Sequence, residues 1–259
     1  MLTALSASPT PAMADTWSEL KPVIFKDIKL QTAAGEITLK APYRAADDRR
    51  VPVTISADLK NGEKIRRITF IIDENPMPVS AIFDMSKPSS DASFSTFMRL
   101  NGPSTLRAVL ETESGKYYMT QRFVKTSGQG ACAAPPVGDP EELLVDLGKM
   151  QMEQKLASDE KVKATRIKRR AHLKIKHPNL TGLQMDQITL RYILARFVNK
   201  IEIDQGDEKL FTVTGSISFS ENPELTFDYN FNGSDNLKVK MVDTDKASFT
   251  ETFPVGIGS

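Results

Sequence analysis

The chain has 259 residues, of which 34 are basic and 33 acidic, and 40% of its residues are hydrophobic. This length and composition allow one large domain or two ordinary domains with buried cores. The balanced charge argues against a nucleic-acid-binding protein, which normally carries a basic excess on one face. No run of about 18 apolar residues occurs, so the sequence predicts no membrane-spanning helix.

Residues 1–14 are small, apolar and uncharged, and they end in the sequence Ala12-Met13-Ala14. Small residues at this spacing are typical of the cleavage site of a secretory signal. We therefore interpret residues 1–14 as a signal-peptide remnant and expect an exported protein. A disordered N-terminal tail is the alternative interpretation.

Residues 35–126 contain a series of short runs in which apolar and polar side chains alternate. These runs are "EITLKA", "VPVTISA", "RITFII", "SFSTFMRL", "TLRAVLE" and "YYMTQRFV". A period of two predicts strands with one buried and one solvated face. Turn signals such as Asn101-Gly102-Pro103 and Ser114-Gly115 separate the runs. About seven short strands at this spacing predict an immunoglobulin-like sandwich.

The segment 128–165 is predicted to be an arm and a linker. Its first part is rich in glycine, alanine and proline, and "PEELLVDLGKMQMEQKLASDE" then places Leu143, Leu147 and Met150 at helical spacing after a possible cap at Asp139. Met150 and Met152 suggest a methionine metal site, but packing is the commoner role of methionine. The basic run "KVKATRIKRR" favours a solvated strand face or linker rather than a nucleic-acid patch.

Alternation returns in residues 166–259, in "HLKIKH", "RYILARFVNKIEI", "LFTVTGSISFS", "LTFDYNF" and "LKVKMV". These runs predict a second β-module of ordinary domain size. The expected fold class is therefore all-β, with two immunoglobulin-like β-sandwich domains joined by a partly helical linker.

Cys132 is the single cysteine of the chain and lies in "VKTSGQGACAAPP". A lone cysteine in an exported protein suggests an intermolecular bond or a reactive thiol, whereas a buried small hydrophobe is the alternative. Because Gly128, Gly130, Ala131 and Ala133 surround it, we expect a flexible arm that exposes the thiol to solvent. No neighbour in sequence lowers its pKa, so the thiol should be only partly ionised at neutral pH.

The two histidines, His172 and His177, complete the candidates for chemistry. A Cys–His pair is conceivable, but no third group that orients the base is evident, and a loop-shaping role for His177 before Pro178 is simpler. Two histidines and one cysteine are too few for a typical zinc site, so no metal and no catalytic residue are predicted.

The first half resembles the SoxY family, the sulfur-carrier subunits of periplasmic thiosulfate oxidation. The resemblance lies in "APYRAADDRRVPVTISA", "ENPMPVSAIFDMS", "ASFSTFMRL" and "AVLETESGKYYMTQRFVKTS". The second half resembles its partner family SoxZ through "LKIKHPNLTGL", "FVNKIEI", "SISFSENPELTFDY" and "LKVKMVDT". The order in one polypeptide is similar to the fused SoxYZ-like carriers associated with quinoprotein dehydrogenases. We therefore expect a SoxY-like domain at 15–127, the arm and linker at 128–165 and a SoxZ-like domain at 166–259.

The resemblance implies that Cys132 is the covalent attachment site of a sulfur-containing intermediate. It also implies a periplasmic carrier that serves Sox-type or quinoprotein dehydrogenase redox enzymes and that has no cofactor and no catalysis of its own. One departure is that the SoxY arm ends in Gly-Gly-Cys-Gly-Gly, whereas here Gly-Ala-Cys-Ala-Ala-Pro-Pro continues into a linker. Alanine and proline restrict the backbone, so the arm is a tethered loop.

Other hypotheses remain open at this point. The chain is alternatively a non-catalytic scaffold for a periplasmic quinoprotein dehydrogenase, with the arm as a docking element. A free-standing thiol hydrolase is a third hypothesis, disfavoured because no base-orienter arrangement is evident. The single thiol can also link two chains as a disulfide.

Overall fold

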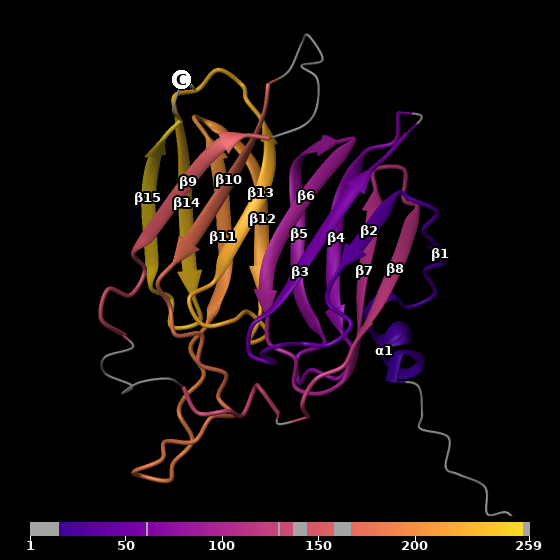
Figure 1. Cartoon of the computed structure of the whole chain (residues 1–259). Helices are drawn as coiled ribbons and strands as arrows, with labels where there is room; N and C mark the ends of the chain where they lie inside the picture. The colour runs from indigo at the N-terminus through magenta and orange to yellow at the C-terminus, as the bar shows by residue number, and fades with distance from the viewer. Residues whose placement is uncertain (1–15, 61, 129, 137–143, 158–166, 256–259) are drawn as a thin grey trace, which may run out of the picture.

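The computed structural model describes residues 16–60, 62–128, 130–136, 144–157 and 167–255, which form two β-sheets packed face to face (Figure 1). The predicted signal-peptide remnant at 1–14, the predicted helix start at 139–143 and residues 161–166 of the basic run lie outside the described residues. Among the helices that the structure describes, none has the length and apolar character required to cross a membrane.

The first half begins with a short helix and continues as eight strands. These elements are α1 (Thr16–Phe25), β1 (Leu30–Thr32), β2 (Ile37–Lys40), β3 (Val51–Asp58), β4 (Ile65–Ile72), β5 (Val79–Ser89), β6 (Asp91–Met98), β7 (Ser104–Thr112) and β8 (Tyr117–Val124). Strands β3 and β6 alternate strictly between buried and less buried residues, as the period-two pattern predicts.

The second half contributes seven strands. These are β9 (Met150–Leu156), β10 (Lys168–Ile175), β11 (Val198–Gln205), β12 (Glu208–Gly215), β13 (Glu224–Asn230), β14 (Asn236–Asp243) and β15 (Ser248–Pro254). The predicted all-β fold is therefore confirmed.

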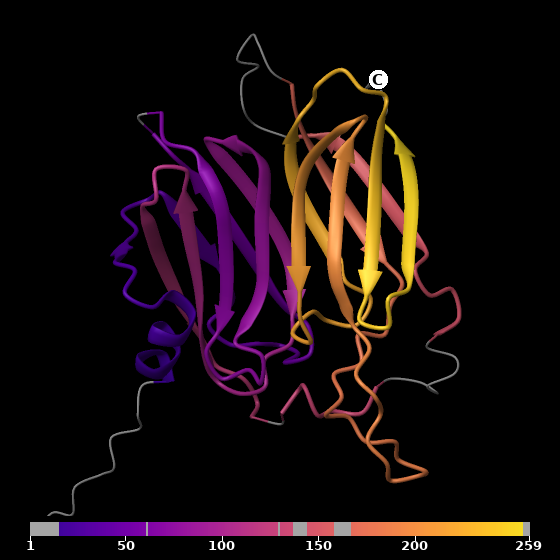
Figure 2. The same cartoon turned by 180° about the vertical axis from the view of Figure 1, so that it is seen from behind.

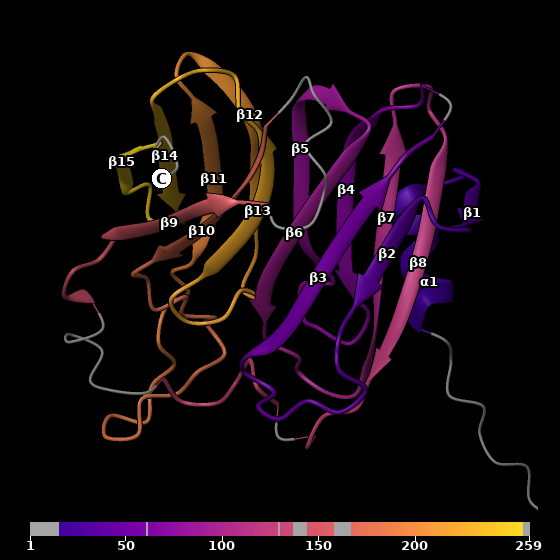
Figure 3. The ribbon, with the colours of Figure 1, turned by 45° about the horizontal axis from the view of Figure 1, so that its top comes forward.

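Both sheets run without a break across the two halves. The nine-stranded sheet has the order β1-β8-β7-β4-β5-β12-β11-β14-β15 and faces the viewer in Figure 2, whereas the six-stranded sheet has the order β2-β3-β6-β13-β10-β9. The halves join where β12 pairs antiparallel with β5 and where β13 pairs antiparallel with β6. Figure 3 shows the two layers along their length. Edges that two separate sandwiches would expose are thus paired with each other.

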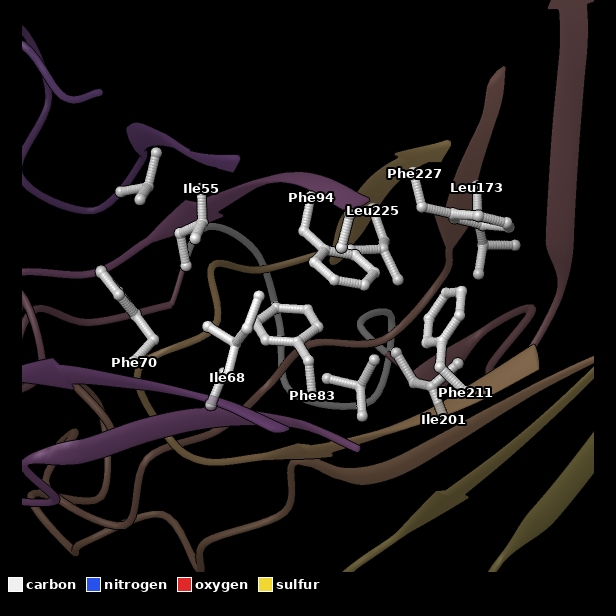
Figure 4. Close-up of a cluster of buried hydrophobic side chains, with 14 of the residues drawn as sticks. Ile55, Ile68, Phe70, Phe83, Phe94, Leu173, Ile201, Phe211, Leu225 and Phe227 are labelled. Atoms are coloured by element: carbon white, nitrogen blue, oxygen red, sulfur yellow. The ribbon is translucent and has the colours of Figure 1, made fainter. Parts of the chain in front are cut away.

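One hydrophobic core fills the space between the two sheets. A row of aromatic rings crosses the junction (Figure 4): Phe83 stacks on Phe94 at 4.4 Å between ring centroids, and Phe94 meets Phe211 edge-on at 5.1 Å. Phe211 in turn contacts Phe227 at 5.0 Å. Because Phe83 and Phe94 belong to the first half and Phe211 and Phe227 to the second, the halves share one core.

The helix predicted around Leu147 and Met150 is wrong in the part that the structure describes. Residues 144–148 form a short turn, and β9 begins at Met150 and pairs antiparallel with β10. Met150 is 6% exposed and packs in the core, and Met152 packs against the same core, so this run follows a period of two. Gly148 is the last residue of this turn. Glycine is required there, because a Cβ would lie 2.1 Å from the Phe249 ring.

Three further differences concern which helices and strands form and where one strand begins. Helix α1 was not predicted; its Trp17 contacts Phe25, and the Arg107 guanidinium lies 4.3 Å from the centroid of the Trp17 ring. Strands β1, β5 and β15 were also absent from the predicted series. The run "RYILARFVNKIEI" is a strand only from Val198 onward, because its first part belongs to a loop.

Candidate functional site

The segment that carries Cys132 leaves the end of β8 and lies at the lower end of the molecule in Figure 1, beside the long loop between β10 and β11. Gly128 and Gly130 have φ angles of 82° and 66°, in the left-handed region that favours glycine. The amide of Ala133 then donates a 2.9 Å hydrogen bond to the Gly130 carbonyl oxygen. Residues 130–133 therefore form a closed turn with Cys132 inside it, which we call the Cys132 turn.

The Cys132 side chain is fully buried, with 0% of its surface exposed, and the neighbouring Ala131 is 3% exposed. The prediction that the segment exposes its thiol to solvent is therefore wrong for this structure. Small residues, which suit a flexible arm, also allow a tight turn to press against other elements. Ala133 keeps its side chain exposed.

Polar side chains from both halves of the chain hold the Cys132 turn. Asn101, in the loop before β7, accepts a 3.4 Å hydrogen bond from the Cys132 amide. Thr181, in the loop after β10, donates a 2.6 Å hydrogen bond from its hydroxyl to the Cys132 carbonyl oxygen. Gln184 donates from Nε2 to the Ala134 carbonyl oxygen at 3.0 Å.

Arg99 lies close enough to this turn to interact electrostatically with Cys132, and it is 4% exposed. Its Nη1 donates to the carbonyl oxygens of Asn179 at 2.7 Å and of Phe219 at 2.8 Å. Arg99 belongs to the first half and both acceptors to the second, so this guanidinium fixes the loop after β10 on the first half. Burial lowers the pKa of Arg99, and the Coulombic effect of Cys132 acts in the opposite direction.

Asn75 positions the backbone around Arg99 and Asn101. Its Nδ2 donates to the Arg99 carbonyl oxygen at 2.8 Å and to the Ser218 hydroxyl at 2.9 Å, and its Oδ1 accepts from the Asn101 amide at 2.9 Å. Asn75 is itself 4% exposed. The backbone of Arg99 and of Asn101 is thus held in place by hydrogen bonds to the Asn75 side chain.

Burial raises the pKa of the Cys132 thiol to about 11, and Arg99 offsets part of this effect through its positive charge. The thiolate is the nucleophilic form of cysteine. In the closed turn the thiol is therefore neutral and unreactive at neutral pH, contrary to the expectation of partial ionisation.

Comparison with known families gives two matches along the chain. Residues 23–132 match the model of the sulfur oxidation protein SoxY, and residues 156–254 match the model of the sulphur oxidation protein SoxZ. The chain belongs to the SoxY and SoxZ families, joined in one polypeptide. This membership places it among the carrier proteins of sulfur oxidation.

A solved structure from Chlorobium limicola f thiosulfatophilum, described as the sulfur carrier protein SoxY, is similar to the chain. It is 27% identical, with a TM-score of 0.37, and the match covers 43% of this chain and 92% of that protein. No significant match was found among curated proteins.

The SoxY half contributes Arg99, Asn101 and the Cys132 turn, and the SoxZ half contributes Thr181 and Gln184. Sequence analysis missed these four side chains as site residues. Arg99 lies within the quoted motif "ASFSTFMRL", Asn101 follows this motif directly, and Thr181 lies within "LKIKHPNLTGL". The motifs were recognised, but nothing in the sequence indicated that they meet around Cys132.

Both histidines are held by neighbouring side chains or backbone groups of the SoxZ half. His177 is fully buried; its Nδ1 accepts a 3.0 Å hydrogen bond from the Asn179 amide, and its Nε2 lies 3.6 Å from the Asp243 carboxylate. His172 contacts Thr226 at 2.8 Å and Glu224 at 3.1 Å on strand β13. His177 thus shapes the loop after β10, whose Asn179 binds Arg99.

Within the described ranges, no group of three or more His, Cys, Asp or Glu side chains has a geometry that could hold a metal ion. Met150 and Met152 both contact the hydrophobic core.

Proposed function

We propose that this chain is a periplasmic carrier protein that holds a sulfur-containing intermediate covalently on the Cys132 thiol while partner redox enzymes act on it. The chain itself supplies no catalytic group in this proposal. Partner enzymes of a Sox-type or quinoprotein dehydrogenase system activate and process the carried group.

The observation that carries the proposal is the position of Cys132. It is the only cysteine of the chain and the last residue of the SoxY match, and side chains of both families bind its turn. A structural cysteine needs no such arrangement, because packing alone retains a small hydrophobe.

A buried carrier thiol requires an open conformation in which the Cys132 turn leaves its site. Three hydrogen bonds hold the turn to the two halves: Asn101 accepts one from the turn, and Thr181 and Gln184 each donate one to it. Neutral hydrogen bonds of this kind contribute roughly 1 kcal/mol each, so an open state a few kcal/mol above the closed one is consistent with the contacts. The closed state would protect the thiol or its adduct between partners.

The loop beside the turn supports the proposed interaction with partner proteins, and the N-terminal sequence supports the proposed export. The loop after β10, which binds the turn through Thr181, exposes Ile188 by 91% and Leu194 by 86%. The same loop exposes Leu190 by 70% and Tyr192 by 67%, and a cluster of exposed apolar side chains commonly marks a protein-contact surface. The small apolar run at residues 1–14 supports the periplasm as the compartment.

The direct experiment is intact-mass analysis of the protein purified from cells that oxidise reduced sulfur compounds. The proposal predicts mass additions that a reducing agent removes and that are absent in Cys132→Ser. A thiol that stays unmodified in active cells would overturn the proposal. The same samples on a non-reducing gel would reveal any disulfide-linked dimer, which also needs the turn to open.

The burial of Cys132 favours one alternative, a scaffold role in which the turn is a fixed structural element beside a docking surface for a quinoprotein dehydrogenase. The two functions differ in one variant. Cys132→Ser leaves the partner system active if the chain is a scaffold, and inactivates it if the chain is a carrier.

A further inference from the structure

The loop after β10 is a hairpin of residues 180–196, drawn in orange below the sheets of the SoxZ half in Figures 1 and 2. Its base is closed by two backbone hydrogen bonds between Leu180 and Arg196, at 2.8 and 3.0 Å. Further from the base, Met185 pairs antiparallel with Tyr192. The segment is therefore an ordered two-stranded ribbon, which we call the 180–196 hairpin.

The tip of this hairpin is also fixed by hydrogen bonds. The Asp186 carboxylate accepts from the amides of Ile188 at 2.9 Å and of Thr189 at 2.6 Å, and the Asp186 carbonyl oxygen accepts from the Leu190 amide at 3.0 Å. An element that is ordered before it binds loses less conformational entropy on binding. The hairpin is thus suited to present its side chains to another molecule.

The two faces of the hairpin have different surroundings. Gln184 is buried, and its side chain donates to the Ala134 carbonyl oxygen beside the Cys132 turn, so the inner face of the hairpin binds the segment that carries the thiol. Neighbouring side chains of a paired strand point to opposite faces, and directly paired residues share a face. The outer face therefore consists of Leu183, Met185, Tyr192 and Leu194.

Large apolar side chains are exposed more densely on this hairpin than on the other elements. Of the 13 that are exposed in the described part of the chain, five lie within residues 183–194: Leu183, Ile188, Leu190, Tyr192 and Leu194. Such a concentration on one small element is typical of a contact surface for another molecule.

One charge on the hairpin lacks a counter-ion. Arg196, at the base, pairs with Asp243 at 2.8 Å and with Asp245 at 3.3 Å. Arg191, near the tip, has no carboxylate within ion-pair distance among the residues that the structure describes. A complementary surface would therefore combine an apolar recess with a carboxylate at its border.

We infer that the outer face and tip of the 180–196 hairpin dock the redox enzyme that acts on Cys132, through an apolar recess of that enzyme bordered by a carboxylate opposite Arg191. This inference rests on the proposed carrier function and adds the surface that the partner recognises. Because the base and inner face of the same hairpin bind the Cys132 turn through Thr181 and Gln184, an enzyme on the outer face lies beside the thiol that it must reach. Neither a second copy of the chain nor a lipid surface has to be near the thiol.

The test measures how much of the carrier the partner system needs. Purified full-length protein is added to a periplasmic extract of cells that lack this chain, and the rate of thiosulfate oxidation is recorded against protein concentration. Tyr192→Ser/Leu194→Ser removes two apolar contacts of the outer face. We expect the half-maximal concentration to rise roughly tenfold, equivalent to about 1.4 kcal/mol, with an unchanged maximal rate. An unchanged half-maximal concentration would overturn the inference.

Matched variants assign the effect to the hairpin. Val23→Ser/Val145→Ser removes two exposed aliphatic side chains elsewhere and should leave the half-maximal concentration as it is. Arg191→Gln should raise it about two- to fivefold, as expected for one exposed ion pair, whereas Arg122→Gln on β8 should not.

A structural role of the outer face has a different signature. Tyr192→Ser/Leu194→Ser should leave the urea midpoint and the rate of Cys132 alkylation by iodoacetamide unchanged, because the replaced side chains are exposed. Faster alkylation in this variant would mean that the outer face stabilises the Cys132 turn and would count against docking.

Two measurements on purified protein under reducing conditions test the other occupants of the outer face. A wild-type dimer in sedimentation velocity that dissociates in Tyr192→Ser/Leu194→Ser would assign this face to a second copy of the chain. Flotation of the wild type, but not of this variant, with phosphatidylethanolamine–phosphatidylglycerol vesicles would assign it to lipid. Either result would overturn the inference, which predicts a monomer that does not float.

The outcome is separable from that of the proposed function. If Cys132→Ser supports oxidation as well as the wild type does, the carrier function fails, while a raised half-maximal concentration in Tyr192→Ser/Leu194→Ser still supports docking of the partner system on the hairpin. If Cys132→Ser is inactive and the hairpin variant behaves as the wild type, the carrier function stands and the docking surface is eliminated. An extract that the wild type does not stimulate would count against both.

Discussion

The hydroxyl of Thr181 lies 2.6 Å from the carbonyl oxygen of Cys132 and donates a hydrogen bond to it, across 49 positions of sequence. Thr181 is 5% exposed, and its oxygen also accepts from the Leu183 amide at 3.2 Å. This contact joins the loop of the SoxZ half to the turn of the SoxY half. The exposure of the thiol therefore depends on the conformation of that loop.

Removal of this donor should open the Cys132 turn more often. Thr181→Val preserves the shape of the side chain but deletes the hydroxyl, and a neutral hydrogen bond contributes about 0.5–1.5 kcal/mol. We expect Cys132 to be alkylated by iodoacetamide roughly two- to tenfold faster than in the wild type, as followed by intact mass. Thr181→Ser, which retains the donor, is the control, and equal rates in the wild type and Thr181→Val would contradict the expectation.

The pH dependence of Cys132 alkylation should report the buried thiol. Burial raises its pKa from an ordinary value near 9 to about 11, with Arg99 acting in the opposite direction. The alkylation rate of the folded protein should therefore keep rising about tenfold per pH unit through pH 9, because the thiolate is the reacting form. The same protein in urea should level off near pH 9. A plateau near pH 9 in the folded protein would indicate an exposed thiol instead.

The same pKa shift has a consequence for stability. Between about pH 9 and pH 11 the unfolded thiol loses its proton while the folded thiol keeps it, so the free energy of unfolding falls as pH rises through this window. The contribution is fully present below pH 9. In Cys132→Ala the free energy of unfolding should fall less over this window, because the titrating thiol is absent. Urea titrations of the wild type and the variant at pH 8.5 and 10.5 would measure the two declines.

The shared core predicts that the two halves unfold together. Phe227 lies in the SoxZ half with 0% exposure, whereas the single tryptophan, Trp17, lies in the SoxY half. Phe227→Ala should cost about 3–5 kcal/mol, and it should shift the urea midpoint of Trp17 fluorescence together with that of circular dichroism. Phe123→Ala, at a side chain that is 45% exposed, is the control and should shift both only slightly. An early dichroism transition with unchanged Trp17 fluorescence would show that the halves are independent.

Period-two alternation was sufficient to predict most strands, because each strand buries one face in the core. It could not predict how the halves join, since pairing of β5 with β12 depends on backbone groups at the strand edges and not on side-chain alternation. The run containing Met150 and Met152 fits both periods locally, and only the pairing of β9 with β10 decides for a strand.

For the candidate site, the sequence identified Cys132 but not its surroundings. Glycine and alanine before a cysteine, with alanine after it, are compatible with an open arm and with a tight buried turn. The difference arises from Thr181 and Gln184, which are about 50 residues away in the chain. Contacts of this separation depend on the tertiary fold, so burial of the thiol was not predictable from its neighbours.

The buried His177 should make the fold sensitive to acid within a defined range. Desolvation lowers the pKa of His177 from 6.5 to about 4, although Asp243 acts in the opposite direction. The unfolded histidine therefore binds a proton below about pH 6.5 while the folded one does not until about pH 4, and the free energy of unfolding falls as pH drops through this window. The loss is on the order of 3 kcal/mol at its largest. His177→Asn keeps an acceptor for the Asn179 amide but cannot titrate, so its stability should decline less between pH 6.5 and 4 in urea titrations. Parallel declines in the two proteins would show that His177 gains its proton as readily in the folded state as in the unfolded chain.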